Sequence, residues 1–318
     1  MSTAFVLSGG GSLGAVQVGM LQALAARGIE PDLLVGTSAG AMNAAWVGAH
    51  GTSPTSLAGL ADVWAGLRRA DVFPVDVRTA VRGILGRSPA VTSPDRLRRL
   101  VASCAGIATL EETGIPVHLV TADLVSGQTV TLSTGSLVDG VLASAAVPGV
   151  FPPVVRDGRH LVDGGVAHHT GVAQAVALGA TTIYVLPTGT PCALPDPPAS
   201  AIGTAVHALS LLIEQRLARE MELLAGAAMI RLLPPLCPLR TSAIDFAHGA
   251  VLVERARRAA LEWIDSGAVD RPAPERFLAA HRHRQSASGQ TRNEETPSVG
   301  VRRTPEVGPG PVEVKRPA

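Results

Sequence analysis

Two Gly-x-Ser-x-Gly segments in this chain carry a serine with the surroundings of a nucleophile. They are Gly10–Gly14, around Ser12, and Gly36–Gly40, around Ser38. A serine on a sharp turn from a strand into a helix exposes its hydroxyl beside the helix N–H groups, and can attack a carbonyl carbon. With 34 glycines in 318 residues, such a segment arises by chance in roughly one chain in four. The surrounding elements therefore have to decide between the two serines.

The elements around both segments predict that the segments share one edge of a parallel sheet. Residues 4–8 are apolar and predict a strand, and the helical spacing of residues 15–26 predicts a buried helix that ends at Gly28. Residues 32–35 predict a second strand, and residues 39–49 a second helix. This alternation is typical of a parallel sheet, in which the loops after the strands and the helix N-termini lie at one edge.

The glycine-rich loop at residues 9–14 has two interpretations. It matches a G-x-G-x-x-G dinucleotide fingerprint, but Asp32 lies at the wrong end of the second strand to hold a ribose. In the interpretation that we favour, the loop is an oxyanion hole whose donors are the backbone N–H groups of Gly9, Gly10 and Gly11. Under this interpretation Ser38 is the nucleophile, and Ser12 belongs to the start of a helix.

A serine nucleophile needs a base, and Asp163 is the carboxylate at a predicted strand end. It follows residues 160–162, which form a predicted hairpin with residues 154–155, and it precedes Gly164 and Gly165, which allow close backbone approach. Asp163 acting directly on Ser38 is the economical interpretation; in the alternative, Asp163 only caps a turn. Three histidines come late enough in the chain to serve instead, but none follows a recognisable strand-end turn: His207, His248 and His281.

The rest of the chain continues the mixture of helices and strands. Further helices are predicted at residues 56–69, 93–105, 136–146, 202–224 and 250–266, and further strands at residues 116–122, 128–132, 182–186 and 229–233. Residues 71–92 read as irregular, either a loop that packs on the core, which we favour, or a flap over the site. For the long helix at 202–224 we expect packing on the sheet and not membrane insertion.

The composition indicates a globular chain without a polyanionic partner. Its 46% of hydrophobic and 17% of charged residues suffice for a sizeable core, and a net charge of +1 with 3% aromatic residues argues against nucleic acid. Cys104, Cys192 and Cys237 are widely spaced, which predicts buried free thiols in a reducing compartment. There is no signal-peptide pattern and no apolar run long enough to span a bilayer, so we expect a cytoplasmic protein.

Two parts of the chain differ in composition. Residues 1–270 predict one domain, and residues 271–318 a C-terminal segment. From about residue 282 the segment is rich in Ser, Gly, Pro, Thr, Glu and Arg and cannot bury enough apolar surface to order itself, so we expect disorder there.

Four segments in this order resemble the patatin-like phospholipase family: the glycine loop at 9–14, Gly36–Gly40, the block at 143–153, and Asp163-Gly164-Gly165. The resemblance covers roughly residues 4–265. It implies an α/β fold, a three-layer α/β/α sandwich with a central, mainly parallel sheet. It also implies a Ser38–Asp163 dyad and an oxyanion hole in the first loop. The motif residues that support this machinery are Gly14, Gly36, Gly40, Gly164 and Gly165.

The implied activity is hydrolysis of lipid acyl esters through an acyl-Ser38 intermediate, without metal or cofactor. The implied partner is a lipid or acyl ester, with transient contact at a membrane surface. Acyl transfer by the same dyad, and a catalytically weak lipid-binding or regulatory protein, remain as alternatives. The chain departs from the family at Leu13, where Arg or Lys is usual, and at His169 and Gly171, where Asn and Pro are common. The Asp163 loop is then held differently, and His168 or His169 is a candidate to assist protonation, although a plain surface role is the simpler interpretation.

Overall fold

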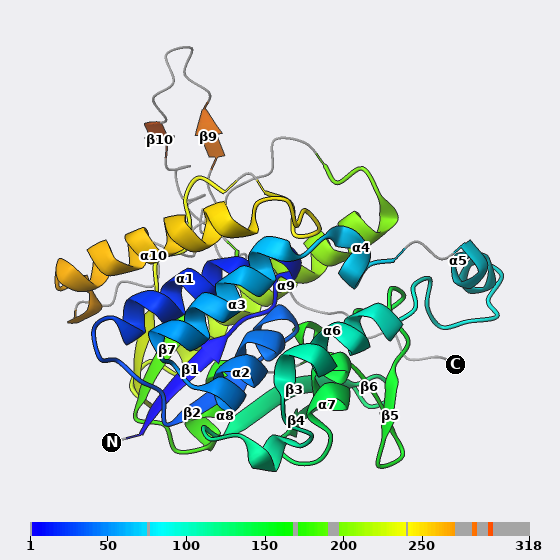
Figure 1. Ribbon diagram of the computed structural model, residues 1–318, viewed down its shortest axis with the longest axis horizontal. Helices are drawn as coiled ribbons and strands as arrows, with labels where there is room; N and C mark the ends of the chain where they lie inside the picture. Colours follow the sequence, from blue (N-terminus) through cyan, green and yellow to red (C-terminus); the bar gives the residue numbers. More distant parts are fainter. Residues whose placement is uncertain are drawn as a thin grey trace, which may run out of the picture.

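A central sheet of eight strands, covered by helices on both faces, organises the molecule (Figure 1). The computed structural model describes residues 2–74, 77–167, 171–189, 197–239 and 241–270, and the strands at 282–284 and 292–294. The strands of the central sheet are β1 (Thr3–Leu7), β2 (Leu33–Gly36), β3 (Val117–Asp123), β4 (Thr129–Leu132), β5 (Val154–Arg156), β6 (Arg159–Asp163), β7 (Thr182–Leu186) and β8 (Met229–Leu232).

The helices alternate with these strands along the chain. The α-helices are α1 (Gly14–Ala25), α2 (Ala39–His50), α3 (Pro54–Gly66), α4 (Arg69–Val72), α5 (Val77–Ile84), α6 (Asp95–Ala105), α7 (Leu137–Ser144), α8 (Gly171–Ala177), α9 (Ala201–Leu223) and α10 (Gly249–Asp265). The 3-10 turns are η1 (Gly11–Leu13), η2 (Leu110–Glu112), η3 (Gly164–Val166) and η4 (Ala268–Asp270).

The strand order places the chemistry-bearing loops next to one another. The order is β5-β6-β3-β2-β1-β7-β8, and β4 also pairs with β3. Strands β3, β2, β1, β7 and β8 are parallel, with Leu7 paired to Gly36, so the loops after β1 and β2 leave the same edge side by side. Strand β6 runs antiparallel to β3 and pairs Asp163 with Thr121, which brings Asp163 to that edge from the other direction.

The sheet separates two hydrophobic cores because successive side chains of a strand point to opposite faces. On β1, Phe5 and Leu7 belong to the core beneath α1, α2, α3 and α10, whereas Ala4 and Val6 belong to the core beneath α8 and the second half of α9. The fold is therefore the three-layer α/β/α sandwich with a mainly parallel sheet that the sequence predicts (Figure 1).

The segment at 71–92 departs from the sequence-based interpretation. Irregular structure was expected there, but the segment begins within the last turn of α4 and contains the whole of α5. Most helices are identified in a sequence by a buried apolar stripe, but the two valines of α5 whose exposure is described do not form one. Val77 is 71% exposed and Val81 48% exposed, so its periodicity does not reflect packing on the core.

Two further expectations concern thiols and the C-terminal segment. Cys104 is half-buried and Cys237 exposed, so the prediction of buried thiols is wrong for both, and Cys192 lies outside the described residues. Most residues after 270 also lie outside them; β9 (Arg282–Arg284) and β10 (Arg292–Glu294) pair as a small antiparallel ribbon. In the part of the chain that the structure describes, no helix has the length and apolarity to cross a membrane.

The contact between α1 and α10 gives a test of the packing. A methyl group on Gly19 of α1 would lie 2.1 Å from the Val253 carbonyl oxygen and 2.6 Å from the Arg257 amide nitrogen of α10. We expect Gly19→Ala to lower the free energy of unfolding by about 1–3 kcal/mol, because overpacking forces the helices apart. Urea denaturation measures it. Gly66→Ala, where a methyl group meets nothing within 4 Å, is the matched control and should not destabilise; equal stability of both variants would contradict the packing.

Candidate active site

Ser38 occupies a strained turn between β2 and α2. Its φ of 54° and ψ of −118° lie where L-residues are rarely found, and such strain is concentrated at functional sites. The flanking glycines make the turn possible by close approach. A methyl group on Gly40 would lie 2.1 Å from the Leu7 carbonyl oxygen, and one on Gly36 would lie 2.6 Å from the Gly40 carbonyl oxygen. Both positions therefore exclude any side chain.

The block that contains α7 holds both Ser38 and Asp163. The Ser38 N–H donates to the Ser144 hydroxyl at 3.0 Å, and that hydroxyl donates to the Val120 carbonyl oxygen at 2.7 Å. Two residues further on, the Ala146 carbonyl oxygen accepts from the Asp163 N–H at 2.9 Å. One short segment thus fixes the backbone of both residues. The sequence singled out this block by resemblance but gave Ser144 no role.

Asp163 is completely buried and incompletely hydrogen-bonded. Its Oδ1 accepts from the Gly165 N–H at 2.7 Å, whereas Oδ2 is buried without a hydrogen-bond partner in the described residues. Burial raises the pKa of Asp163 to about 6, and the Gly165 N–H and the nearby Ser38 hydroxyl both oppose that rise. The carboxylate beside Ser38 is therefore more basic than an ordinary one, and Oδ2 is available for a proton.

The loop after β1 places two of the predicted oxyanion donors at the pocket beside Ser38. Gly10 and Gly11 line a pocket together with Ser38, and no backbone acceptor among the described residues receives their N–H groups. Gly11 has a φ of +58° and packs so closely on the Ala243 carbonyl that a methyl group would lie 2.2 Å from its oxygen. Gly9 lies beside Ser38 but faces a second, smaller cavity. The loop can therefore offer N–H groups to an oxygen bound next to Ser38.

Ser12, the rival nucleophile, is turned away from this pocket. It is 2% exposed, its hydroxyl donates to the Ser242 carbonyl oxygen at 3.0 Å, and its N–H donates to the Ala243 carbonyl oxygen at 2.8 Å. Ser12 is thus a buried residue of η1 that ties the glycine loop to residues 242 and 243. This position agrees with the expectation that Ser12 belongs to a helix start.

A buried polar network holds the glycine loop to the sheet. The Gln17 amide donates to the carbonyl oxygens of Ser8 and Leu186, at 2.8 and 2.9 Å, which fixes the ends of β1 and β7. Gln17 in turn accepts from the Asn43 amide at 2.8 Å, and Asn43 accepts from the Trp64 indole N–H at 2.8 Å. Gln17 and Asn43 are fully buried, and every link is satisfied. Such networks rigidify the groups that they join.

Two further polar side chains support the loops, and sequence reasoning missed both. The Thr188 hydroxyl, after β7, donates to the Gly9 carbonyl oxygen. From α9, the Arg216 guanidinium donates to the carbonyl oxygens of Gly165, at 3.1 Å, and of Ala167. Arg216 thereby holds the turn that follows Asp163. No local pattern marks either residue, since their partners lie about 50 or more positions away in the chain.

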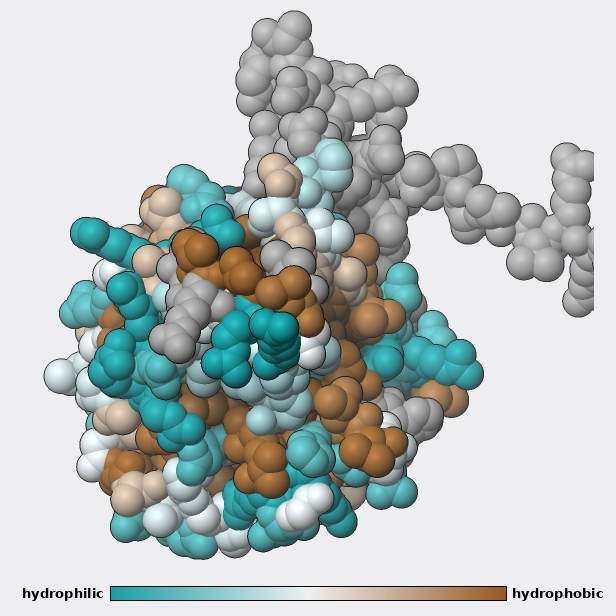
Figure 2. All heavy atoms as spheres, turned by 90° about the vertical axis from the view of Figure 1, so that its right-hand side faces the viewer, coloured by the Kyte–Doolittle hydropathy of each residue, from teal (hydrophilic) through white to brown (hydrophobic). Residues whose placement is uncertain are grey.

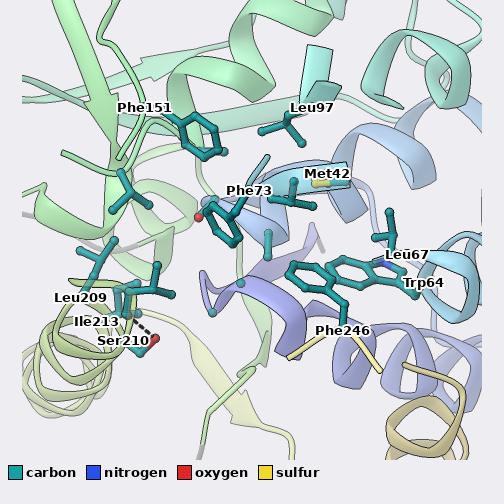
Figure 3. Close-up of a pocket in the computed structure, with 18 residues that line it drawn as sticks. Met42, Trp64, Leu67, Phe73, Leu97, Phe151, Leu209, Ser210, Ile213 and Phe246 are labelled. Atoms are coloured by element: carbon teal, nitrogen blue, oxygen red, sulfur yellow. Dashed lines mark hydrogen bonds between the residues drawn. The ribbon is translucent and has the colours of Figure 1, made fainter. Parts of the chain in front are cut away.

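An apolar pocket opens beside Ser38 and contains about 580 Å³ of empty space, its mouth included. Three phenylalanines form part of its wall: the Phe73 ring centroid lies 5.6 Å from that of Phe151 and 6.2 Å from that of Phe246 (Figure 3). The other large lining side chains come from α2, α3, α4, α6, α9 and the segments after α3 and α7: Met42, Trp64, Leu67, Val72, Leu97, Val147, Val206, Leu209 and Ile213. A chain of methylene groups is the ligand chemistry that suits such a lining.

Of the candidate histidines, the structure describes His207 and His248. Within the described residues, no histidine lines the pocket. His248 pairs with Asp245 at 3.3 Å, away from Ser38, and His168, His169 and His281 lie outside the described residues. Among the described residues, Asp163 therefore remains the candidate base.

The departures from the family pattern are buried where they are described. Leu13 is 6% exposed and belongs to the hydrophobic core under α1 and α3. An arginine there would enter the core unless its side chain turned outward. Gly171 begins α8, and a methyl group on it would lie 2.8 Å from Val6 Cγ1. The close approach of α8 to β1 accounts for a residue without a side chain at this position.

The sequence and the fold were compared with known proteins. Residues 5–176 match the family model described as patatin-like phospholipase. An uncharacterized NTE family protein of Mycobacterium tuberculosis is 29% identical over 168 residues, which are 53% of this chain and 27% of the relative. Patatin-like phospholipase domain-containing protein 7 of Rattus norvegicus is 30% identical over 192 residues, or 58% of this chain and 13% of the relative. The chain thus spans less than a third of the length of these relatives.

Solved structures with a similar arrangement were also found. VipD from Legionella pneumophila matches with a TM-score of 0.43 and 16% identity, covering 83% of this chain and 67% of that one. ExoU from Pseudomonas aeruginosa matches with a TM-score of 0.37 and 17% identity, covering 83% and 53%.

The burial of Asp163 predicts a pH-dependent stability. Because its pKa is raised from 3.8 in the unfolded chain to about 6 in the folded protein, the folded state binds the proton more tightly. Stability contributed by this group is therefore present below about pH 4 and is lost as the pH rises to 6. We expect Asp163→Asn, which never ionises, to be more stable than the parent by about 3 kcal/mol at pH 8, with little difference at pH 4. Urea denaturation at both pH values measures this, and an equal difference at both would contradict the shift.

The Ser144 hydroxyl predicts a second effect on stability. Ser144→Ala removes the acceptor of the buried Ser38 N–H and a donor to the buried Val120 carbonyl oxygen. We expect a loss of about 1–3 kcal/mol in the free energy of unfolding. Ser103→Ala, which removes an exposed hydroxyl bonded to its own helix, is the control and should change stability by less than about 0.5 kcal/mol. Similar values for the two variants would show that the Ser144 contacts are not important.

Proposed function

Because the chain belongs to the patatin-like phospholipase family, whose model matches more than half of it, we propose that it is a serine hydrolase of lipid acyl esters. Ser38 is the nucleophile, Asp163 the base, and the N–H groups of Gly10 and Gly11, with Gly9 beside them, the oxyanion donors. The observation that carries the proposal is the convergence of these groups at a pocket with an apolar lining.

The first half of the reaction forms an acyl-enzyme. Ser38 Oγ attacks the ester carbonyl carbon while its proton passes to Asp163 Oδ2, the carboxylate oxygen that has no hydrogen-bond partner among the described residues. The carbonyl oxygen becomes negatively charged and accepts from the glycine-loop N–H groups, each such donor lowering the barrier by about 2.7–4 kcal/mol. The tetrahedral intermediate then collapses, the C–O bond to the alcohol breaks, and Asp163 returns its proton to the leaving alcohol.

The second half repeats these steps with water. Asp163, ionised again, takes a proton from a water molecule as that water attacks the acyl carbon. The oxyanion forms in the same place, and the ester bond to Ser38 breaks as Ser38 Oγ recovers the proton. The fatty acid leaves and the site is restored. The strained backbone of Ser38 keeps Oγ fixed in the same place through both halves.

The pocket supports a long acyl group as the recognised part of the substrate. Its lining offers Ser210 as a further polar side chain besides Ser38, and the Ser210 hydroxyl already donates to the Val206 carbonyl oxygen at 3.0 Å. The described lining therefore selects for apolar length and not for a polar head group. A lipid ester with its acyl chain in the pocket and its head group at the mouth fits this pattern.

The nucleophile assignment predicts selective labelling. We expect a fluorophosphonate probe to modify Ser38, because Ser38 Oγ is at the pocket and Ser12 Oγ is not. Peptide mapping by mass spectrometry locates the label. Ser38→Ala should abolish both labelling and ester hydrolysis, whereas Ser12→Ala should still be labelled at Ser38. Folded protein that stays unlabelled at Ser38 while hydrolysing esters would refute the assignment, and product analysis with an added alcohol separates hydrolysis from acyl transfer.

The base assignment predicts the pH dependence of turnover. Asp163 must be ionised to accept the proton, so turnover of a soluble short-chain ester should rise as the pH passes through about 6 and level off above pH 7. Asp163→Asn should lose about two to four orders of magnitude in turnover, as expected on removing a general base, while remaining folded at pH 8. Full activity in this variant, or a flat profile between pH 5 and 8, would place the base elsewhere.

A further inference from the structure

Helix α5 projects from the body of the protein (Figure 1). It lies on the segment that connects Phe73 to Val91. Before α5, Phe73 is buried in the pocket wall against Phe151. After α5, the N–H groups of Val91 and Thr92 donate to the carbonyl oxygens of Gly149 and Val150, at 3.2 and 3.0 Å. The segment that carries α5 is therefore held at one end in the pocket wall and at the other end beside the pocket-lining residue Phe151.

Helix α5 exposes an apolar stripe that nothing in the described structure covers. Val77 is 71% exposed, Val81 48% and Leu85, which continues the helical bonding through its N–H to Val81 O at 3.0 Å, 60%. Residues spaced by four lie on one side of a helix. Three large apolar side chains therefore face solvent together, which is a costly arrangement for a helix without a partner.

The charge around this stripe indicates the partner. Residues 67–100 contain eight arginines and three aspartates, a net charge of +5, in a chain whose total is +1. Arg82 and Arg87 are exposed next to the stripe. Figure 2 views the molecule from this side and shows hydrophobic residues gathered on the face with hydrophilic ones among them. An exposed apolar stripe with arginines beside it is typical of a helix that lies in the interface of an anionic lipid surface.

We propose that α5 is the element with which this protein docks on an anionic lipid surface. Val77, Val81 and Leu85 enter the acyl region, and Arg82 and Arg87 contact the phosphate groups. Because the segment is held at one end in the pocket wall and at the other end beside Phe151, docking presents the pocket mouth to the lipid. This inference extends the proposed function, which supplies the reason for bringing the mouth to a membrane, but the docking itself requires no catalysis.

Vesicle binding of the full chain carrying Ser38→Ala tests the docking apart from the chemistry. We expect co-sedimentation with vesicles of phosphatidylcholine and phosphatidylserine, weaker binding to phosphatidylcholine alone, and a decrease with added salt. Adding Val77→Asp and Val81→Asp should lower the bound fraction at least tenfold. Arg82→Glu with Arg87→Glu should remove the preference for the anionic vesicle. Leu223→Asp is the control. Leu223 is 70% exposed, but it ends α9 near the start of β8, at the other edge of the sheet from β5. This variant should bind vesicles as the parent does.

The remaining outcomes decide against the proposal. Absence of binding to either vesicle, or unchanged binding by the Val77→Asp, Val81→Asp protein, would overturn it. A change of oligomeric state in that variant, with vesicle binding unaffected, would assign the stripe to a contact between two copies. With Ser38 intact, the same variant should hydrolyse a soluble short-chain ester at the parent rate and vesicle lipids at least tenfold more slowly. If the variant loses the same factor of activity on both substrates, α5 acts on the pocket and not on docking. If the parent protein hydrolyses neither substrate, only the proposed function is rejected.

Discussion

The turn at Ser38 is the constraint on which the site depends. A positive φ at a residue with a side chain persists only where the surrounding structure holds it, and here the holding groups come from several elements. Gly40 touches the end of β1, Gly36 touches the start of α2, and Ser144 accepts the Ser38 N–H. Because β1 and β2 are parallel neighbours, the same geometry that strains the turn also sets the glycine loop beside it.

Burial of the Asp163 carboxylate is a second destabilising feature, next to the strained backbone of Ser38. A carboxylate that is buried, with one oxygen unpaired among the described residues, is unfavourable in its charged form, and its pKa of about 6 reflects that cost. The Gly165 N–H offsets part of that cost. The Ala146 carbonyl oxygen holds the Asp163 backbone, and Arg216 holds the turn after it. A group that destabilises the folded state, yet is secured by this many contacts, is typical of functional machinery.

The apolar pocket is assembled from elements that are far apart in the chain. Trp64 shows how it is joined to the polar site: one edge of the indole lines the pocket, and its N–H begins the chain of hydrogen bonds through Asn43 and Gln17 to the ends of β1 and β7. The apolar wall and the glycine loop are therefore parts of one rigid unit. Helix α9 has a similar double role, with Leu209 and Ile213 in the pocket and Arg216 on the Asp163 turn.

Local signals in the sequence determined the alternation of strands and helices, the two glycine segments, the hairpin before Asp163 and the choice of Ser38, Asp163 and the glycine loop as the candidate site. These signals suffice for those features because the spacing of apolar residues and the requirement for glycine in a tight turn both depend on only a few neighbouring residues. They failed for α5, in which Val77 and Val81 face solvent, and for Cys237, which is exposed.

Only the tertiary structure decided that Ser12 is bonded away from the pocket, that Ser144, Thr188 and Arg216 hold the loops, and that Asp163 is buried with a free oxygen. Several of these contacts join residues between about 50 and 230 positions apart, and a desolvated carboxylate is defined by everything packed around it. Neither property is written in any single stretch of sequence.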